Sequence, residues 1–425
     1  MQTKHTNSLA LRQTAMGDRS VDLPLFPPRV GEFRRDADPS LPWPLELDFD
    51  YSALDLSLFR APRCGPSLGL GAWAPLMPPL TPQTNLGEGE TPFFEMAALA
   101  EWAGTDRPLF VKDEGRNPTW SHKDRLNRCT VSAAQLAGAP GVIVASSGNH
   151  GASASAYAAA AGLPCIVLAS STAPLAMQRF VAAYGAAALA VPADRRWDLM
   201  ARLQAKTGFH PVSNLTPQAH TGHPFAIEGY KSIAYEVFRD LGGTAPGSVF
   251  VPTGYGELLY GVWKGFAELK ALGLTDRVPQ LYSCESTVYG PLHRALRDDQ
   301  PVVSVPSPNG STRALSIATP VGGLRGRRAI LESGGKALAM DDEAIEAARA
   351  KLAQTGLWVE FSAAAGLAGL RQLAGHAELA EGAVVCLATA SGMKDVDGAG
   401  EGLPETDGSF EDATRVLREN YGLEI

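Results

Sequence analysis

From residue 108 onward, short apolar runs alternate with longer stretches of helical composition, and this alternation constrains the fold more than any other feature. The apolar runs are bounded by Gly or Pro and read PLFVKD, GVIVAS, PCIVLAS and AALAVP. The helical stretches between them cover 123–138, 149–162, 173–185 and 195–208. Strand-like runs that alternate with helices of this length are typical of βαβ units. The sequence therefore predicts an α/β protein with open, twisted, mostly parallel sheets flanked by helices.

The alternation resumes after residue 224, with helical stretches over 226–241, 258–272, 341–355 and 362–376. The apolar runs of this region read SVFVP, QLYSCE and AVVCLAT. No fixed-period repeat stands out, which argues against a solenoid or a propeller. We therefore expect a two-lobed α/β architecture, and such folds bind ligands at the carboxyl ends of their parallel strands.

Charge and composition narrow the classes of partner. The chain has 37 Lys and Arg against 45 Asp and Glu, a formal net charge of −8. Recognition of nucleic acid or of a membrane surface favours clustered basic residues, so we expect neither partner. With 45% hydrophobic and 19% charged residues, the chain can bury a sizeable core.

Cysteine usage indicates a reducing, cytoplasmic compartment. The five cysteines are scattered and show no CxxC spacing, so we expect neither a disulfide scaffold nor a metal site. The first twenty residues lack the continuous apolar stretch of a secretory signal. The uncharged run 151–178 is interrupted by Gly-Leu-Pro, which argues against a membrane span.

Four turns between a strand and a helix carry polar residues that could act on a ligand. Lys123 opens the helix that follows PLFVKD, and a Ser-Ser-Gly-Asn turn follows GVIVA. A Gly-Tyr-Gly turn follows SVFVP, and Thr-Ala-Ser-Gly-Met-Lys-Asp comes after AVVCLA. Backbone N–H groups at a helix start suit a carboxylate or a phosphate. Taken singly, each turn also has an ordinary explanation, such as a solvated lysine or a helix N-cap.

In this order and at these separations, the four turns resemble those of the fold-type II pyridoxal-phosphate enzymes of the tryptophan synthase β superfamily, with the threonine synthase branch nearest. Asn-Pro-Thr-Trp-Ser-His-Lys-Asp-Arg is similar to that branch's Asn-Pro-Thr-Gly-Ser-Phe-Lys-Asp-Arg, and the fourth turn to its Thr-Gly-His-Gly-Leu-Lys-Asp. The stretch Glu-Gly-Tyr-Lys-Ser, residues 228–232, also agrees. The resemblance covers roughly 86–395 and implies pyridoxal 5′-phosphate as the cofactor.

The resemblance also implies a role for each turn. Lys123 forms the Schiff base with the cofactor aldehyde and then moves protons. Asn117 hydrogen-bonds the ring hydroxyl, and Thr389 faces the ring nitrogen. The cofactor phosphate is surrounded by Thr253, Gly254, Tyr255 and Gly256. The amino-acid substrate is bound by Ser121, Ser146, Ser147, Gly148, Asn149 and His150.

The same resemblance divides the chain into functional segments. We expect a Pro-rich, extended lead-in over 1–85, with short elements. A cofactor-binding lobe is expected over 86–145 and 226–400, and a smaller substrate-binding lobe over 146–225. Residues 401–425 are expected to form a C-terminal tail helix.

Several residues depart from the branch's pattern. Trp120 stands where the branch has Gly, His122 where it has Phe, and Ser391 where it has His. Glu257 lies in the phosphate turn, so it must point away from the phosphate or meet a cation. If the substrate carries a phosphate of its own, basic groups must be near, and the candidates by position are Lys112, Arg125 and Lys231.

The expected activity is that of a lyase or synthase in amino-acid biosynthesis, most like threonine synthase, which converts O-phosphohomoserine and water to threonine and phosphate. β-Replacement on O-phosphoserine, as in cysteate synthase, and ammonia loss from serine or threonine remain alternatives. A protein that keeps the fold without turnover is a further alternative. A homodimer is expected, as is common for such enzymes.

Overall fold

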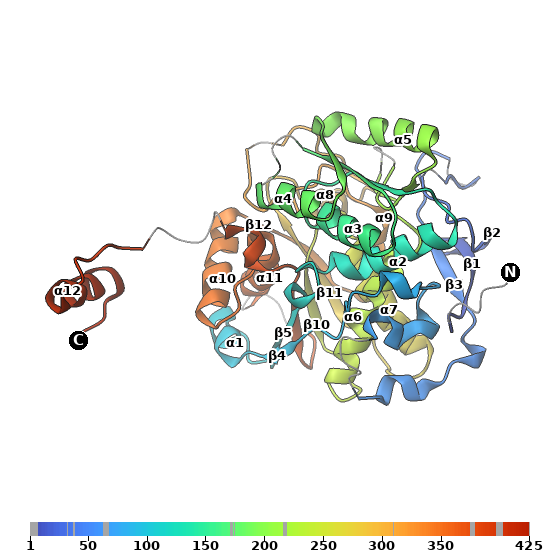
Figure 1. Cartoon of the computed structure of the whole chain (residues 1–425). Helices are drawn as coiled ribbons and strands as arrows, with labels where there is room; N and C mark the ends of the chain where they lie inside the picture. The colour runs from blue at the N-terminus through green and yellow to red at the C-terminus, as the bar shows by residue number, and fades with distance from the viewer. Residues whose placement is uncertain are drawn as a thin grey trace. The chain divides into compact units, whose positions relative to one another are not determined.

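Two mainly parallel sheets flanked by helices form the framework of the computed structural model (Figure 1). The structure describes residues 7–31, 33–36, 39–62, 68–170, 173, 175–215, 219–308, 310–374, 379–396 and 403–424. The chain divides into two units, Met1–Lys394 and Asp395–Ile425. The expected mixture of helices and parallel sheets is confirmed.

The larger sheet has six strands in the order β12-β11-β10-β13-β5-β4. All its neighbouring strands are parallel except β4, which runs antiparallel to β5. The central strands are short and buried because their residues are almost all apolar, which is typical of a sheet covered on both faces. The strands are β4 (Phe93–Glu95), β5 (Leu109–Asp113), β10 (Ser248–Pro252), β11 (Gln280–Ser286), β12 (Lys336–Met340) and β13 (Val384–Ala388).

The smaller sheet is wholly parallel and has four strands in the order β8-β7-β6-β9. Its strands are β6 (Val142–Val144), β7 (Cys165–Ala169), β8 (Ala187–Ala190) and β9 (His210–Pro211). Strand β6 pairs with β7 and β9, so the smaller sheet begins before residue 146, where the sequence placed the start of the smaller lobe.

The helices predicted in the alternating region are present, with ends that differ by no more than three residues from the expectation. Residues 375–376 of the last predicted helix lie outside the described residues. The helices of the larger unit are α1 (Ala97–Ala103), α2 (Lys123–Leu136), α3 (Asn149–Ala160), α4 (Leu175–Ala183), α5 (Arg196–Thr207), α6 (Ala226–Asp240), α7 (Glu257–Ala271), α8 (Pro291–Arg297), α9 (Leu324–Ser333), α10 (Asp342–Gln354) and α11 (Ala365–Leu373).

The N-terminal segment is more ordered than the expected extended lead-in. Its strands β1 (Ala10–Ala15), β2 (Asp18–Pro24) and β3 (Leu45–Phe49) form an antiparallel sheet in the order β2-β1-β3. Leu47, Phe49, Phe59 and Trp73 of this segment are buried in the same apolar cluster as residues of α6 and α7. The prolines that suggested an extended chain lie mostly outside these strands, whose alternating apolar residues supply the buried face.

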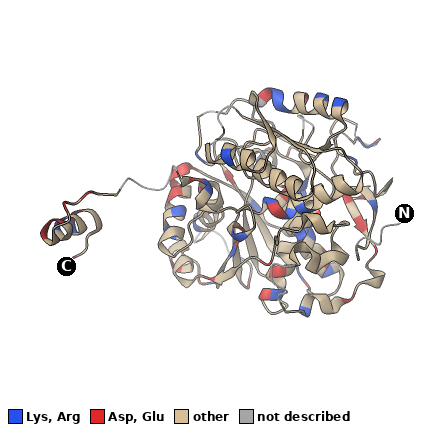
Figure 2. Ribbon diagram, in the orientation of Figure 1, with Lys and Arg blue, Asp and Glu red and all other residues tan. Residues whose placement is uncertain are grey.

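The C-terminal unit contains helix α12 (Phe410–Tyr421), which begins after Ser409, whose hydroxyl accepts the N–H of Asp412 at 3.1 Å. This agrees with the helix expected in the tail, of which residues 401, 402 and 425 lie outside the described residues. Figure 2 shows Lys and Arg interspersed with Asp and Glu along the ribbon. Among the described residues, no helix combines the length and the apolar character that crossing a membrane requires.

Candidate active site

The carboxyl ends of three neighbouring strands, β10, β13 and β5, bring the first, third and fourth turns to one edge of the larger sheet. An isolated antiparallel bridge between Ser121 and Ala390 connects the first turn, here called the lysine turn because it precedes Lys123, with the fourth turn. The backbone nitrogen and the ring Nδ1 of His122 both lie 3.0 Å from the carbonyl oxygen of Thr389. Lys123, which follows His122, and the buried Thr389 are therefore held close together at this edge.

Lys123 is the first residue of α2, and a tyrosine holds its amine. Nζ lies 3.1 Å from the hydroxyl oxygen of Tyr230 on α6. Gly229 permits this approach, because a Cβ there would lie 2.1 Å from a carbonyl oxygen of α2. Burial lowers the pKa of Lys123, although the carboxylates of Glu257 and Glu360 act in the opposite direction. A lowered pKa increases the share of neutral amine, the form that attacks an aldehyde.

The Tyr230→Phe variant is expected to lower kcat about tenfold and to change KM less than twofold, because the hydroxyl orients the amine that moves protons. The Tyr230 hydroxyl accepts a hydrogen bond from the charged form of Lys123, so its removal should lower the pKa of Lys123. The part of the pH dependence of kcat that follows this lysine should then shift to lower pH. Tyr235→Phe is the matched control, since this buried hydroxyl lies on the same helix but contacts Glu268. Steady-state kinetics from pH 6 to 10 provide the measurement. Identical profiles for wild type and Tyr230→Phe would contradict the role of Tyr230.

The four residues expected to bind the cofactor phosphate form the turn between β10 and α7: Thr253, Gly254, Tyr255 and Gly256. Gly256 has φ +89°, and a Cβ there would lie 2.8 Å from the Cα of Gly326, so glycine is required on both counts. The ring of Tyr255 stacks on that of His220 with centroids 3.9 Å apart. The first N–H groups of α7 have no partner within the helix and are available to an anion.

Glu257, the first residue of α7, meets a cation, as the sequence required. Its Oε1 lies 3.2 Å from Nη1 of the buried Arg325 on α9. Its Oε2 lies 4.0 Å from Nε2 of His220. Gly222 leaves the space for this carboxylate, because a Cβ there would lie 1.7 Å from Oε1 of Glu257. The ion pair with Arg325 removes the repulsion expected between Glu257 and a phosphate in the neighbouring turn.

The second turn lies at the amino end of α3 and contains the residues expected to bind the substrate: Ser146, Ser147, Gly148, Asn149 and His150. The Asn149 amide nitrogen donates to the carboxylate of Glu360 at 2.6 Å. The Asn149 amide oxygen accepts from Nζ of Lys394 at 2.8 Å. Lys394 belongs to the fourth turn, and the N–H of Glu360 donates to the oxygen of Ala390 at 3.0 Å, so these contacts connect the second turn with the fourth.

Buried polar atoms without a hydrogen-bond partner mark a ligand site. Among the described residues, such atoms in the turns or in side chains that contact them include Ser121 Oγ, His150 Nε2, Arg196 Nε, His220 Nδ1 and Thr319 Oγ1. Buried polar groups are normally paired, so these atoms indicate a polar ligand. Burial lowers the pKa of His150 to about 3, and its other ring nitrogen contacts the backbone of Val212, so Nε2 is a free acceptor. These atoms and the glycine turn fit a phosphate-bearing cofactor.

Asn117 forms three hydrogen bonds within the chain. Its amide nitrogen donates to the backbone oxygen and to Oε2 of Glu114, each at 2.9 Å. Its amide oxygen accepts the N–H of Gly89 at 2.9 Å. Asn117 is buried and connects the lysine turn to the segment before β4, and its amide oxygen keeps one lone pair that a ring hydroxyl could use, so its expected role stays a prediction.

Trp120 occupies a backbone conformation that favours glycine, which explains why the branch has Gly at this position. Its φ is +62°, a strained value for a bulky residue. The exposed indole packs edge-on against Phe180 of α4, with ring centroids 5.4 Å apart. The backbone oxygen of Trp120 accepts the N–H of Ser391 at 3.1 Å. Trp120 thus connects the lysine turn with both α4 and the fourth turn.

Sequence reasoning gave no role to Glu360, Tyr230 or Lys394, which the structure places at the site. Burial lowers the pKa of Lys394 to about 8, although Asp124 and Glu360 act in the opposite direction. Tyr230 and Lys394 lie in stretches that resemble the family, so the signal for these two was present. Only the packing showed that their side chains reach the other turns.

The three basic residues proposed as contacts for a substrate phosphate are neither at the surface nor free. Each is fully buried and paired with a carboxylate at 2.7 Å, which corrects the expectation for them: Lys112 with Glu236, Arg125 with Glu114 and Lys231 with Glu228. A cation that already neutralises a buried carboxylate has little charge left for a ligand.

Because of two neighbouring buried histidines, His210 and His223, we expect the folded state to lose stability in acid. The Nε2 atoms of His210 and His223 lie 2.8 Å apart, and Nδ1 of His223 accepts the N–H of Phe225. Burial lowers the pKa of His210 to about 4 and that of His223 well below its usual value. The contribution of these two histidines to the free energy of unfolding is therefore fully present above about pH 6.5, the pKa of histidine in the unfolded chain. It is lost as the pH falls toward 4.

In that pH window, the free energy of unfolding is expected to fall by about 1.4 kcal/mol per pH unit for each histidine. His210→Gln should make the pH dependence of the free energy of unfolding shallower by about this amount between pH 6 and 4.5. Urea denaturation at several pH values gives the slope. The expectation fails if wild type and His210→Gln have equal slopes.

The described geometry agrees with comparisons to known proteins. Residues 84–390 match the family described as "Pyridoxal-phosphate dependent enzyme". The threonine synthase of Methanosarcina acetivorans is 32% identical over 83% of this chain and 86% of its own length. That of Methanocaldococcus jannaschii is 33% identical over 74% and 77%, and that of Mycobacterium tuberculosis 34% over 81% and 92%.

Solved structures show the same fold at lower identity. Threonine deaminase isoform 2 from Solanum lycopersicum superposes with a TM-score of 0.61 and 21% identity, covering 79% of this chain and 89% of that one. Maize serine racemase gives a TM-score of 0.60 and 20% identity, covering 71% and 88%. The chain therefore belongs to the family of pyridoxal-phosphate dependent enzymes, and pyridoxal phosphate is its cofactor.

Proposed function

We propose that the chain catalyses elimination and replacement on an activated amino acid and converts O-phosphohomoserine and water to threonine and phosphate. The observation that carries the proposal is the buried amine of Lys123, which has a lowered pKa and lies 3.1 Å from the hydroxyl of Tyr230. The preceding residue, His122, contacts the carbonyl oxygen of Thr389. The identity of 32–34% with proteins called threonine synthase, over most of the chain, supports this reaction over others of the family.

The residues of the chain have separate tasks in this reaction. When bound, pyridoxal phosphate supplies an electron sink for negative charge that develops next to the substrate's amino group. Lys123 takes protons from the substrate carbons and returns them, and Tyr230 keeps its amine in place. Thr389, a hydroxyl partner, can donate a hydrogen bond to the ring nitrogen without the full charge of a carboxylate.

Two turns orient the cofactor and the substrate. The turn 253–256, with the first N–H groups of α7, would hold the cofactor phosphate, and Arg325 keeps the carboxylate of Glu257 away from it. The turn 146–150 would bind the α-carboxylate of the substrate with the N–H groups at the start of α3. Ser121 and His150, each with an unpartnered polar atom, complete this side of the site.

Release of inorganic phosphate from O-phosphohomoserine by the cofactor-loaded protein tests the proposal, with threonine measured by chromatography. Equal amounts of phosphate and threonine, absent in Lys123→Ala, would support it. Turnover of O-phosphoserine alone would favour β-replacement, and ammonia release from serine or threonine would favour a deaminase. A protein that binds the cofactor but turns over none of these substrates would overturn the proposal.

We also propose that the enzyme is a cytoplasmic homodimer. The four described cysteines, Cys129, Cys165, Cys284 and Cys386, are buried and free, which suits a reducing compartment. Two-fold dimers are the commonest assembly of soluble enzymes. Light scattering should give twice the chain mass of 44.8 kDa, and the monomer mass at micromolar concentration would contradict the dimer.

A further inference from the structure

Arg196, the first residue of α5, has a guanidinium group without an acidic partner among the described residues. Its buried Nε has no hydrogen-bond partner there, and its Nη1 lies 3.3 Å from Oγ of Ser147. Two other arginines nearby in the chain behave differently, since Arg195 pairs with Asp194 at 3.4 Å and Arg202 with Asp198 at 3.9 Å. A buried N–H without an acceptor costs free energy, so Arg196 lacks an acceptor that a ligand can supply.

Ser147 adds a second available donor beside Arg196. Its Oγ already accepts two hydrogen bonds, from the N–H of Ser170 and from Nη1 of Arg196. A hydroxyl oxygen has two lone pairs and one hydrogen, so only the hydrogen of Ser147 remains. The Ser147 hydroxyl and Nε of Arg196 can therefore both donate to a third group, which must be an acceptor.

The position of Arg196 relates it to two of the active-site turns. Ser147 belongs to the second turn, where the substrate carboxylate would bind. Burial raises the pKa of Tyr255 in the third turn to about 12, while the positive charge of Arg196 acts in the opposite direction. Arg196 therefore contacts the second turn through Ser147 and acts electrostatically on a side chain of the third turn.

We propose that Arg196 and Ser147 form the subsite that binds the phosphate group of the amino-acid substrate. The proposal deepens the proposed function and rests on it, because it assumes a phosphorylated substrate. Arg196 has the charge that this role requires, whereas the three basic residues first considered are neutralised by buried carboxylates. When the bond between the substrate carbon and the ester oxygen breaks, that oxygen keeps the electron pair. Arg196 and Ser147 then stabilise the departing phosphate.

Binding of inorganic phosphate to the holoenzyme, measured by calorimetry, tests the subsite without turnover. Arg196→Gln should weaken phosphate binding about 10- to 100-fold, the effect of losing a charged hydrogen-bond donor. Arg195→Gln is the matched control, because this neighbour is exposed and pairs with Asp194. Its affinity for phosphate should equal that of the wild type. The dissociation constant of pyridoxal phosphate is measured for all three proteins in parallel.

The outcomes separate the subsite from the proposed function. Weaker phosphate binding in Arg196→Gln alone, with unchanged cofactor affinity, supports the subsite. Equal phosphate affinity in the wild type and Arg196→Gln, or no binding to the wild type at millimolar phosphate, overturns it. A loss of cofactor affinity in Arg196→Gln would assign the guanidinium to the cofactor phosphate and also overturn it. If phosphate binding depends on Arg196 but O-phosphohomoserine is not turned over, the proposed function fails while the anion site stands.

Discussion

Replacing Lys123 with alanine is expected to lower turnover on the order of a thousandfold or more and to prevent covalent attachment of pyridoxal phosphate to the chain. The amine has two tasks, since it bonds to the cofactor aldehyde and moves protons at the substrate carbons. The structure supports both tasks, because burial lowers the pKa of Lys123 and Tyr230 holds its Nζ at 3.1 Å. Reduction of the holoenzyme with borohydride, followed by peptide mass spectrometry, should place the cofactor on Lys123 in the wild type.

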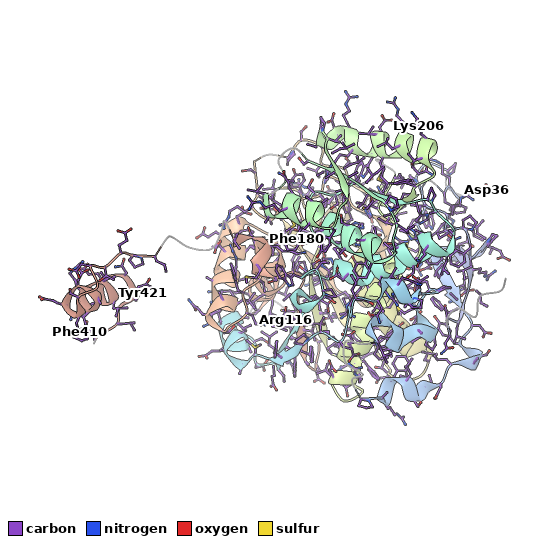
Figure 3. The ribbon with its side chains drawn as sticks, viewed as in Figure 1. Asp36, Arg116, Phe180, Lys206, Phe410 and Tyr421 are labelled. Carbon is purple, nitrogen blue, oxygen red and sulfur yellow. The ribbon has the colours of Figure 1, made fainter. Side chains whose placement is uncertain are left out.

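Lys206→Ala is the control for this experiment. Lys206 is an exposed lysine on α5, and Figure 3 shows it at the outside of the molecule. Its removal should leave both the absorbance of the bound cofactor and kcat unchanged. Retention of more than a tenth of the wild-type turnover in Lys123→Ala, or attachment of the cofactor to another lysine, would contradict the assignment of Lys123.

The fold was predictable where local patterns and packing agree. Apolar runs predicted the strands β5, β6, β7, β8, β10, β11 and β13, because strands covered on both faces need continuous apolar residues. The strands β4, β9 and β12 at or near the sheet edges were not predicted. The antiparallel sheet formed by β1, β2 and β3 was not predicted. Strands β1 and β2 form a hairpin, but β3 pairs with β1 across residues 16–44, and the prolines between β2 and β3 obscured the pattern.

The candidate site was predictable as a set of turns, but not as a set of contacts. The strand order placed the lysine turn, the glycine turn and the fourth turn at one edge, as a parallel sheet requires. The partners of individual side chains depend on packing between segments far apart in the sequence. Asn117, for example, hydrogen-bonds to Gly89 and Glu114, and the helix α6 that carries Tyr230 approaches Lys123 only because residue 229 lacks a Cβ.

Arg125→Met is expected to destabilise the protein by about 3–5 kcal/mol, the largest stability effect among the substitutions considered. The guanidinium of Arg125 is fully buried between Glu114 and Glu236, with Nε 2.7 Å from Glu114 and Nη2 2.8 Å from both carboxylates. Nη1 also donates to Ser232 at 2.7 Å. Burial alone lowers the pKa of Arg125, but the two carboxylates outweigh burial and raise it. Methionine fills similar space but removes the ion pair of Glu114 and leaves Glu236 paired with Lys112.

Two companion variants make this expectation testable even if Arg125→Met does not fold. Arg125→Lys keeps the charge but not the planar fork, so an intermediate loss is expected. Arg116→Met is the surface control, because Arg116 is 67% exposed and its pair with Asp113 at 3.2 Å should contribute less than about 1 kcal/mol. Urea denaturation followed by circular dichroism measures all three. Because Arg125 lies two residues after Lys123, Arg125→Lys should also weaken cofactor binding. If Arg125→Lys loses no more stability than Arg116→Met, the buried ion pairs of Arg125 do not stabilise the turn that carries Lys123.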